Sequence, residues 1–183
     1  MTYYGPKELA AAFRTVRGNT IKIAEEIPEE QYGYRVAPDC RSVAQTLVHI
    51  AVSPRLQQQL HIVERRSTLV GFDFLGFVAK QAAEEESPRS KEQIVELLRF
   101  EGERYAGILE GLSEDFLAER VEYPEGMTPP SKSRFEMLLG PKEHEMHHRG
   151  QLMMVERMLG ITPHLTRHMQ ERVAAMRVAQ ARG

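Results

Sequence analysis

The chain has 183 residues, which is long enough for one domain with a full hydrophobic core and does not require a second. Its formal net charge of -2 and its 27% of charged residues exclude a general affinity for nucleic acid or for an anionic membrane. No run of about 18 apolar residues is present, so we expect no membrane span. A single cysteine, Cys40, cannot form an internal disulfide, and the stretch from Met1 to Pro6 lacks the basic and apolar regions of a signal peptide. We therefore expect a cytoplasmic protein.

The first predicted helix extends from Pro6 to about Ile27. Apolar residues recur there at steps of three and four, which is the pattern of an amphipathic helix. Proline is tolerated in a first turn, and Pro28 ends the pattern. Residues 34–41 are then predicted to form a connecting loop.

The second predicted helix covers residues 42–65. Residues 42–45 have the S-x-x-Q form of a capping box, in which the serine and glutamine side chains satisfy unpaired backbone donors. Pro54 lacks a backbone donor and crowds the carbonyl group of Ile50, so we expect a bend just after His49.

A long connection, residues 66–89, follows the second helix. Residues 69–78 are too apolar for a solvated loop, while residues 80–86 favour a short helix that covers one end of the domain. The segment Phe72–Phe77 either lines the mouth of a pocket or forms a dimer contact, and we expect a homodimer.

Two further capping boxes, at residues 90–93 and 133–136, open the third and fourth predicted helices. These helices are expected to end near Leu112 and at Gly160. Between them, residues 121–126 are expected to be briefly extended.

Pro141 lies inside the fourth helix, one turn before His144, and is expected to bend or break it. The charged segment 163–180 carries apolar residues at steps of three and four, which predicts a last, peripheral helix. We therefore predict a single all-α domain over residues 1–183. Its core is a four-helix bundle at about 6–160, with the C-terminal helix added and a short helix in the connection between helices 2 and 3.

Two histidines of the fourth helix, His144 and His148, are predicted to point toward the core. They share a stripe with three apolar residues, Leu152, Val155 and Leu159. Side chains four residues apart have Cβ atoms about 6 Å apart, so both imidazoles can reach one metal ion. His49 is the best candidate for a third ligand, because it is the only other histidine on a core stripe near the middle of a helix. Three imidazoles with an open coordination position suit Lewis-acid chemistry.

Two stretches carry a family resemblance: S-V-A-Q-T-L-V-H-I-A at residues 42–51 and E-H-E-M-H-H-R-G-Q-L at residues 143–152. Over roughly residues 6–160 the chain resembles the DinB-like (YfiT-like) superfamily of metal-dependent enzymes. Its members are four-helix bundles with one metal-binding histidine in the second helix and an H-x-x-x-H pair in the last. The resemblance implies that the ligands are the three histidines named above and that the metal is Ni²⁺ or Zn²⁺.

The same resemblance implies several reactions. Related bundles include transferases and isomerases that depend on a low-molecular-weight thiol, whose pKa the metal lowers so that the thiolate attacks a second substrate. A metal-activated water would instead make the protein a hydrolase. We place thiol transfer to a small molecule ahead of hydrolysis. The non-catalytic alternative is a metal-binding or stress-response module in which residues 69–78 bind a partner.

Residues 144–148 also satisfy the H-E-x-x-H pattern of zinc proteases, in which Glu145 would be the general base. The extended form of that motif fails because Gly150 stands one position early, and no strand-rich subdomain is evident to hold a peptide. Glu145 stays a candidate catalytic residue, and the alternative is a solvated glutamate or one in an inter-helix salt bridge. Glycine weakens a helix, so Gly150 is expected to pack closely against another helix.

The remaining histidines are assigned positions away from a metal. His147 lies about 100° around the helix from the first histidine of the pair, and we expect it on the helix flank. His164 and His168 are four residues apart but begin a charged terminal helix, so we expect them on a solvated face. His61 lies away from the stripe of the second helix and is predicted to be on the surface.

Overall fold

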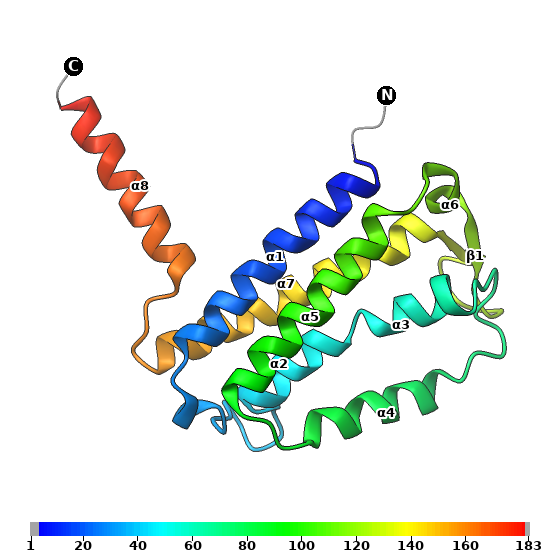
Figure 1. Ribbon diagram of the computed structural model, residues 1–183, viewed down its shortest axis with the longest axis horizontal. Coiled ribbons are helices and arrows are strands. Elements are labelled where there is room, and N and C mark those ends of the chain that lie inside the picture. Colours follow the sequence, from blue (N-terminus) through cyan, green and yellow to red (C-terminus); the bar gives the residue numbers. More distant parts are fainter. Residues whose placement is uncertain (1–3, 182–183) are drawn as a thin grey trace.

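Figure 1 shows the computed structural model, which describes residues 4–181. Four long helices pack against one another as a bundle: α1 (Pro6–Glu26), α2 (Val43–Val52), α5 (Lys91–Glu110) and α7 (Arg134–Met158). The predicted all-α four-helix bundle is therefore confirmed. Residues 1–3, with which the stretch lacking signal-peptide features begins, lie outside the described part.

All three predicted capping boxes are present, and each opens a bundle helix. The hydroxyl of Ser42 accepts from the backbone N–H of Gln45 at 3.2 Å, and the Gln45 side chain accepts from the backbone N–H of Ser42 at 2.9 Å. Ser90 and Ser133 make the same reciprocal pairs at the starts of α5 and α7. These contacts satisfy backbone donors that the first helical turn leaves unpaired, so they determine where the helices begin.

The second predicted helix is interrupted rather than bent. Helix α2 ends at Val52, and the chain continues as α3 (Arg55–Gln58) and a π-helical turn, η2 (Gln59–Val63). Pro54 lies at the junction, where it has no N–H to donate along the helix. The fourth predicted helix is continuous by contrast. Helix α7 runs through Pro141, so this proline does not break it.

The connection after η2 contains the predicted short helix, α4 (Phe74–Glu86), which lies along the outside of α2 (Figure 1). It begins six residues earlier than predicted, because the Asp73 side chain caps it by accepting from the backbone N–H of Gly76 at 2.9 Å. Two further one-turn helices are η1 (Glu29–Gln31) and α6 (Glu114–Ala118).

A small antiparallel ribbon closes the end of the bundle near α6. Strands β1 (Arg120–Glu122) and β2 (Ser131–Ser133) pair with Val121 opposite Lys132. The first strand overlaps the start of the segment predicted to be extended, residues 121–126, whereas the second was not predicted. Val121 is fully buried and packs with Leu60 and Met137, so the ribbon fixes the start of α7 against η2.

The predicted terminal helix, α8 (His164–Gln180), follows α7 and projects away from the bundle (Figure 1). Most of its residues are exposed, and only the first turn contacts α1 closely. Within residues 4–181, no helix combines the length and the apolar composition that crossing a membrane requires.

Candidate metal centre

Three histidines meet between α2 and α7. His49 projects from α2, and His144 and His148 project from successive turns of α7. The Nε2 atom of His144 lies 3.2 Å from Nε2 of His49 and 3.0 Å from Nε2 of His148. All three ligand nitrogens lie within 4.8 Å of one another, and no other such group of histidine, cysteine and carboxylate side chains occurs in the described part of the chain. The structure thus brings together the three residues that the sequence analysis selected.

Hydrogen bonds at the opposite ring nitrogens orient two of these imidazoles. Nδ1 of His49 lies 2.7 Å from Oε1 of Glu85 on α4, and Nδ1 of His148 lies 2.8 Å from Oε1 of Gln151. A carboxylate and an amide oxygen only accept, so each imidazole carries its proton on Nδ1 and keeps a free lone pair on Nε2. This is the tautomer that binds a metal through Nε2.

The three imidazoles are also electrically neutral near pH 7. Burial lowers the pKa of each, and for His144 the further proximity of His148 and His49 lowers the pKa to about 4. For His49 the carboxylate of Glu85 opposes this effect, yet burial dominates and the pKa stays below its usual value. Neutral imidazole is the form that coordinates a cation, so the site needs little deprotonation to accept one.

The geometry fits one divalent ion. Two imidazole nitrogens bound at about 2.1 Å to a tetrahedral ion are separated by about 3.4 Å, and by about 3.0 Å when they are adjacent ligands of an octahedral ion. Two of the three separations, 3.2 Å and 3.0 Å, match these values, and the third lies within 4.8 Å. Imidazole suits both Zn²⁺ and Ni²⁺. Three protein ligands leave at least one coordination position for another molecule.

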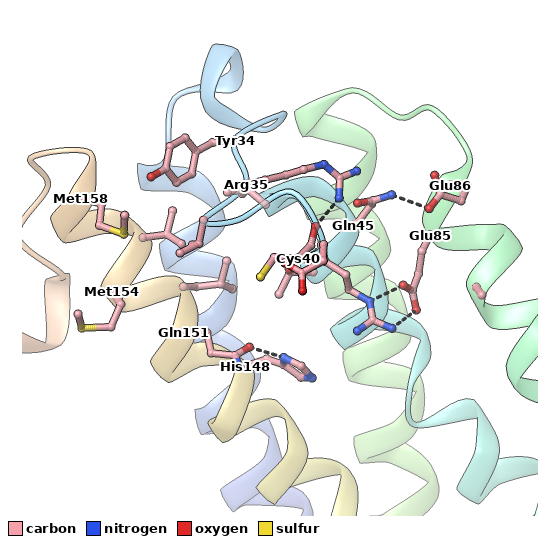
Figure 2. Close-up of a pocket in the computed structure, with 18 of the residues that line it drawn as sticks. Tyr34, Arg35, Cys40, Gln45, Glu85, Glu86, His148, Gln151, Met154 and Met158 are labelled. Atoms are coloured by element: carbon pink, nitrogen blue, oxygen red, sulfur yellow. Dashed lines mark hydrogen bonds and ion pairs between the residues drawn. The ribbon is translucent and has the colours of Figure 1, made fainter.

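A cavity of about 1060 Å³ adjoins the centre and has His148 and Glu85 in its wall (Figure 2). One side is apolar and is formed by residues of α7, among them Leu152, Val155 and Met158. The facing loop before α2 contributes polar groups and the thiol of the protein's single cysteine, which is exposed; these residues are Tyr34, Arg35, Asp39, Cys40 and Arg41. A ligand in this cavity would therefore contact an apolar wall on one side and two guanidinium groups on the other.

Glu145 lies away from the metal centre. Its side chain is almost completely buried and both carboxylate oxygens lie 3.0 Å from Nε of Arg17 on α1. The structure therefore places it in an inter-helix salt bridge, which was the alternative to a catalytic role. We accordingly assign Glu145 no part in the chemistry proposed below.

Three sequence-based expectations about neighbouring residues are wrong or only partly right. His61 was expected on the surface but is fully buried, with Nδ1 2.9 Å from Nη1 of Arg134. His164 is also buried, whereas His168 and His147 are exposed as expected. Gly150 is exposed, and a Cβ atom placed there would have nothing within 4 Å, so close helix packing does not explain it.

Sequence reasoning missed the residues that support the histidines. Glu85 is one of three consecutive glutamates, and nothing in their order shows which one faces the bundle. Gln151 follows His148 by three residues on α7, a spacing that places both on one face and could have identified it. Arg41, whose Nε lies 2.5 Å from Oε2 of Glu85, belongs to a loop that carries no periodic signal.

This protein is a four-helix bundle in which the second bundle helix carries one histidine of the centre and the last bundle helix carries the other two. This arrangement is the one expected for the DinB-like class of proteins. The chain belongs to the DinB superfamily, whose family model matches residues 12–152. Two solved structures from Bacillus subtilis share the fold. The DinB-like protein YjoA has 24% sequence identity and a TM-score of 0.62, over 85% of this chain and 93% of that one.

The second is YfiT, with 14% identity and a TM-score of 0.66 over 88% of this chain and 91% of that one. YfiT is described as a probable metal-dependent hydrolase with an unusual four-helix bundle topology. At these identities the likeness establishes the fold. A search of curated protein sequences found no significant match.

Proposed function

We propose that this protein is a metal-dependent enzyme that acts on a small molecule and that His49, His144 and His148 hold the metal. One observation carries the proposal: three neutral imidazoles direct Nε2 atoms within 4.8 Å of one another, beside a cavity of about 1060 Å³. With the protons of His49 and His148 on Nδ1, an Nε2–H of His144 can donate to only one of their two Nε2 atoms, so at least one inward-facing lone pair has no donor among these rings.

A divalent ion in this position supplies Lewis acidity, which lowers the pKa of a thiol or of water and so provides a nucleophile near pH 7. The protein's own contribution is orientation and exclusion of water. Glu85 and Gln151 hold the rings of His49 and His148 in place. The apolar wall from α7 excludes water from one side of the cavity, and Arg35 and Arg41 offer positive charge to an anionic group of a substrate.

Among metal-dependent reactions, we place transfer of a low-molecular-weight thiol first. The cavity of about 1060 Å³ lies just above the range of about 300–1,000 Å³ that is usual for small-molecule sites, so it can accept a thiol and an electrophile together. Hydrolysis is the second candidate, and the description of YfiT as a probable metal-dependent hydrolase favours it.

Metal content is the first test. Purified protein loaded with Zn²⁺ or Ni²⁺ should retain about one ion per chain after gel filtration, and His148→Ala should retain far less. The control is His168→Ala, which removes an exposed imidazole on α8 and should keep the wild-type metal content. Equal metal content in His148→Ala and wild type would refute the site.

Turnover then separates the candidate functions. Metal-loaded protein is offered chromogenic electrophiles with and without a low-molecular-weight thiol, and activated esters and amides without one. Thiol-dependent turnover that disappears in His148→Ala supports transfer, and thiol-independent turnover supports hydrolysis. A protein that binds metal but turns over none of these substrates fits the non-catalytic module. We also propose a homodimer, which light scattering after size-exclusion chromatography tests, and a cytoplasmic location.

A further inference from the structure

Helix α4 is attached to the bundle in an unusual way. None of its apolar residues is buried, and three apolar side chains are exposed: Phe74, Leu75 and Val78. The contacts that hold it against α2 and α3 are instead polar and lie in its last two turns. Gln81 donates to the carbonyl of Val52 at 2.7 Å, and Glu84 accepts from Arg55 at 2.5 Å. A helix held by a few polar contacts has a small docking free energy, which a single interaction can shift.

The same helix forms part of the cavity beside the metal centre. Ala82, Ala83, Glu85 and Glu86 line it, opposite the apolar residues of α7 (Figure 2). The shape of the cavity therefore depends on whether α4 is docked. Any interaction that favours the docking of α4 on the bundle therefore also favours the form in which α4 completes the wall of the cavity.

Glu85 is the residue of α4 that reaches the proposed metal ligands. Its side chain is only 8% exposed, and its two oxygens contact different elements. Oε1 lies 2.7 Å from Nδ1 of His49, and Oε2 lies 2.5 Å from Nε of Arg41, in the loop before α2. One carboxylate thus joins α4, α2 and the loop before α2.

Metal binding and the docking of α4 require the same form of His49. A metal on Nε2 needs the proton on Nδ1, and the Nδ1 proton is what Glu85 accepts. The positive charge of the ion also strengthens that hydrogen bond. Metal binding and the docking of α4 therefore favour the same state of His49. By thermodynamic linkage, docking increases the association constant for the metal by the same factor by which the metal increases the equilibrium constant for docking.

We propose that Glu85 is a positioning residue that couples metal binding to the docking of α4, so that the wall of the cavity closes when the metal site is filled. This inference rests on the proposed function, since it assumes that His49 binds a metal. Lys80 provides a control on the same helix, because it is exposed and lies outside the lining of the cavity beside the metal centre.

The experiment measures two quantities in the full-length protein: the affinity for Zn²⁺ and hydrogen exchange of the backbone amides of residues 74–86. In wild type, Zn²⁺ should slow exchange in this segment several-fold. Glu85→Ala should weaken Zn²⁺ binding by about tenfold or more and abolish the zinc-dependent protection. Glu85→Gln keeps an acceptor oxygen for Nδ1 of His49 and should restore part of both effects. Lys80→Ala should change Zn²⁺ affinity less than twofold and keep the protection.

The outcomes distinguish this inference from the proposed function. If wild type binds Zn²⁺ but exchange in residues 74–86 is unchanged, the coupling is refuted and the metal site stands. Equal zinc-dependent protection in Glu85→Ala and wild type also refutes it. If wild type binds no Zn²⁺, the proposed function fails and the coupling with it. Circular dichroism of each variant shows whether the bundle is folded, and a folded Lys80→Ala that behaves like Glu85→Ala would refute the specific role of Glu85.

Discussion

Arg17 and Glu145 form an ion pair that joins all four helices of the bundle. Arg17 projects from α1, and its Nε lies 3.0 Å from each carboxylate oxygen of Glu145 on α7. The remaining guanidinium nitrogens donate to backbone carbonyls: Nη1 to Leu98 of α5 at 2.8 Å and Nη2 to Ile50 of α2 at 3.1 Å. In an unbroken helix the Ile50 carbonyl would accept from residue 54, which here is a proline. Arg17 thus supplies a donor that Pro54 cannot.

Removing the carboxylate of this pair should affect stability and not metal binding. Glu145→Ala leaves the buried guanidinium of Arg17 without its counter-charge, and we expect the free energy of unfolding to fall by about 3–5 kcal/mol. Urea unfolding of metal-free protein measures this change. The exposed pair of Arg14 and Glu103 provides a control, since Glu103→Ala should change stability much less.

The metal content of folded Glu145→Ala should equal that of wild type, because the carboxylate contacts Arg17 and not the histidines. A variant that unfolds like wild type but loses its metal or its turnover would show that Glu145 serves the metal centre after all. Such a result would restore the catalytic role that the H-E-x-x-H pattern suggested.

Two helical glycines should respond to alanine in opposite ways. A Cβ atom at Gly102 on α5 would lie 2.7 Å from Cγ of Arg17, so Gly102→Ala should displace the arginine and cost about 1–3 kcal/mol. A Cβ atom at Gly150 on α7 would meet nothing within 4 Å, so Gly150→Ala should stabilise the protein by about 0.5–1 kcal/mol. Thermal and urea unfolding measure both changes. Destabilisation by Gly150→Ala would mean that this position has a neighbour, such as a second copy of the chain.

The sequence was sufficient to predict the elements that depend on local chemistry. Helix starts follow from side chains three residues apart, as Ser42 and Gln45 show, and those pairs form regardless of the rest of the fold. The two histidines of α7 could be placed together because four residues make about one helical turn. His49 was harder, and its selection depended on its being the only other histidine on a predicted core stripe near the middle of a helix.

Features that depend on tertiary arrangement were not predictable in this way. The interruption at Pro54 and the π-helical turn η2 change the angular position of each later side chain, so His61 turns inward although the regular period placed it outside. Glu85 and Arg17 are charged residues on otherwise ordinary amphipathic segments. Their roles follow from which helix lies opposite, and the sequence pattern carries no information about that.

His61 should make the protein more sensitive to acid. It is buried beside Arg134, and burial together with that positive charge lowers its pKa to about 4. In the unfolded chain its pKa is near 6.5, so the unfolded state binds more protons between these values and stability falls as the pH falls from about 6.5 to about 4. His61→Gln cannot titrate and should lose less stability over this interval in urea unfolding of metal-free protein. An unchanged pH dependence would refute the assignment.

Glu156 should have the opposite effect on the pH dependence of stability. Both of its carboxylate oxygens are buried and have no hydrogen-bond partner among the described residues. Burial, followed by the negative charge of Glu26, raises its pKa to about 7, although Arg167 and Arg157 oppose the shift. The folded state therefore binds more protons than the unfolded chain between about pH 4.5 and pH 7, and stability falls as the pH rises through this range.

Glu156→Gln removes this titration and should flatten the fall. One pKa unit corresponds to about 1.4 kcal/mol, and a pKa of about 7 in the folded state against about 4.5 in the unfolded chain leads us to expect a difference of about 2–3 kcal/mol between pH 5 and pH 8. The measurement is the free energy of unfolding of metal-free wild type and variant at both pH values, so that the contributions of the histidines cancel in the comparison. Glu143→Gln, on the exposed face of the same helix, should keep the wild-type difference. If the stability of Glu156→Gln depends on pH as strongly as that of wild type, the carboxylate of Glu156 is ionised in the folded wild-type protein. Arg167, which contacts Glu26, would then be the available counter-charge.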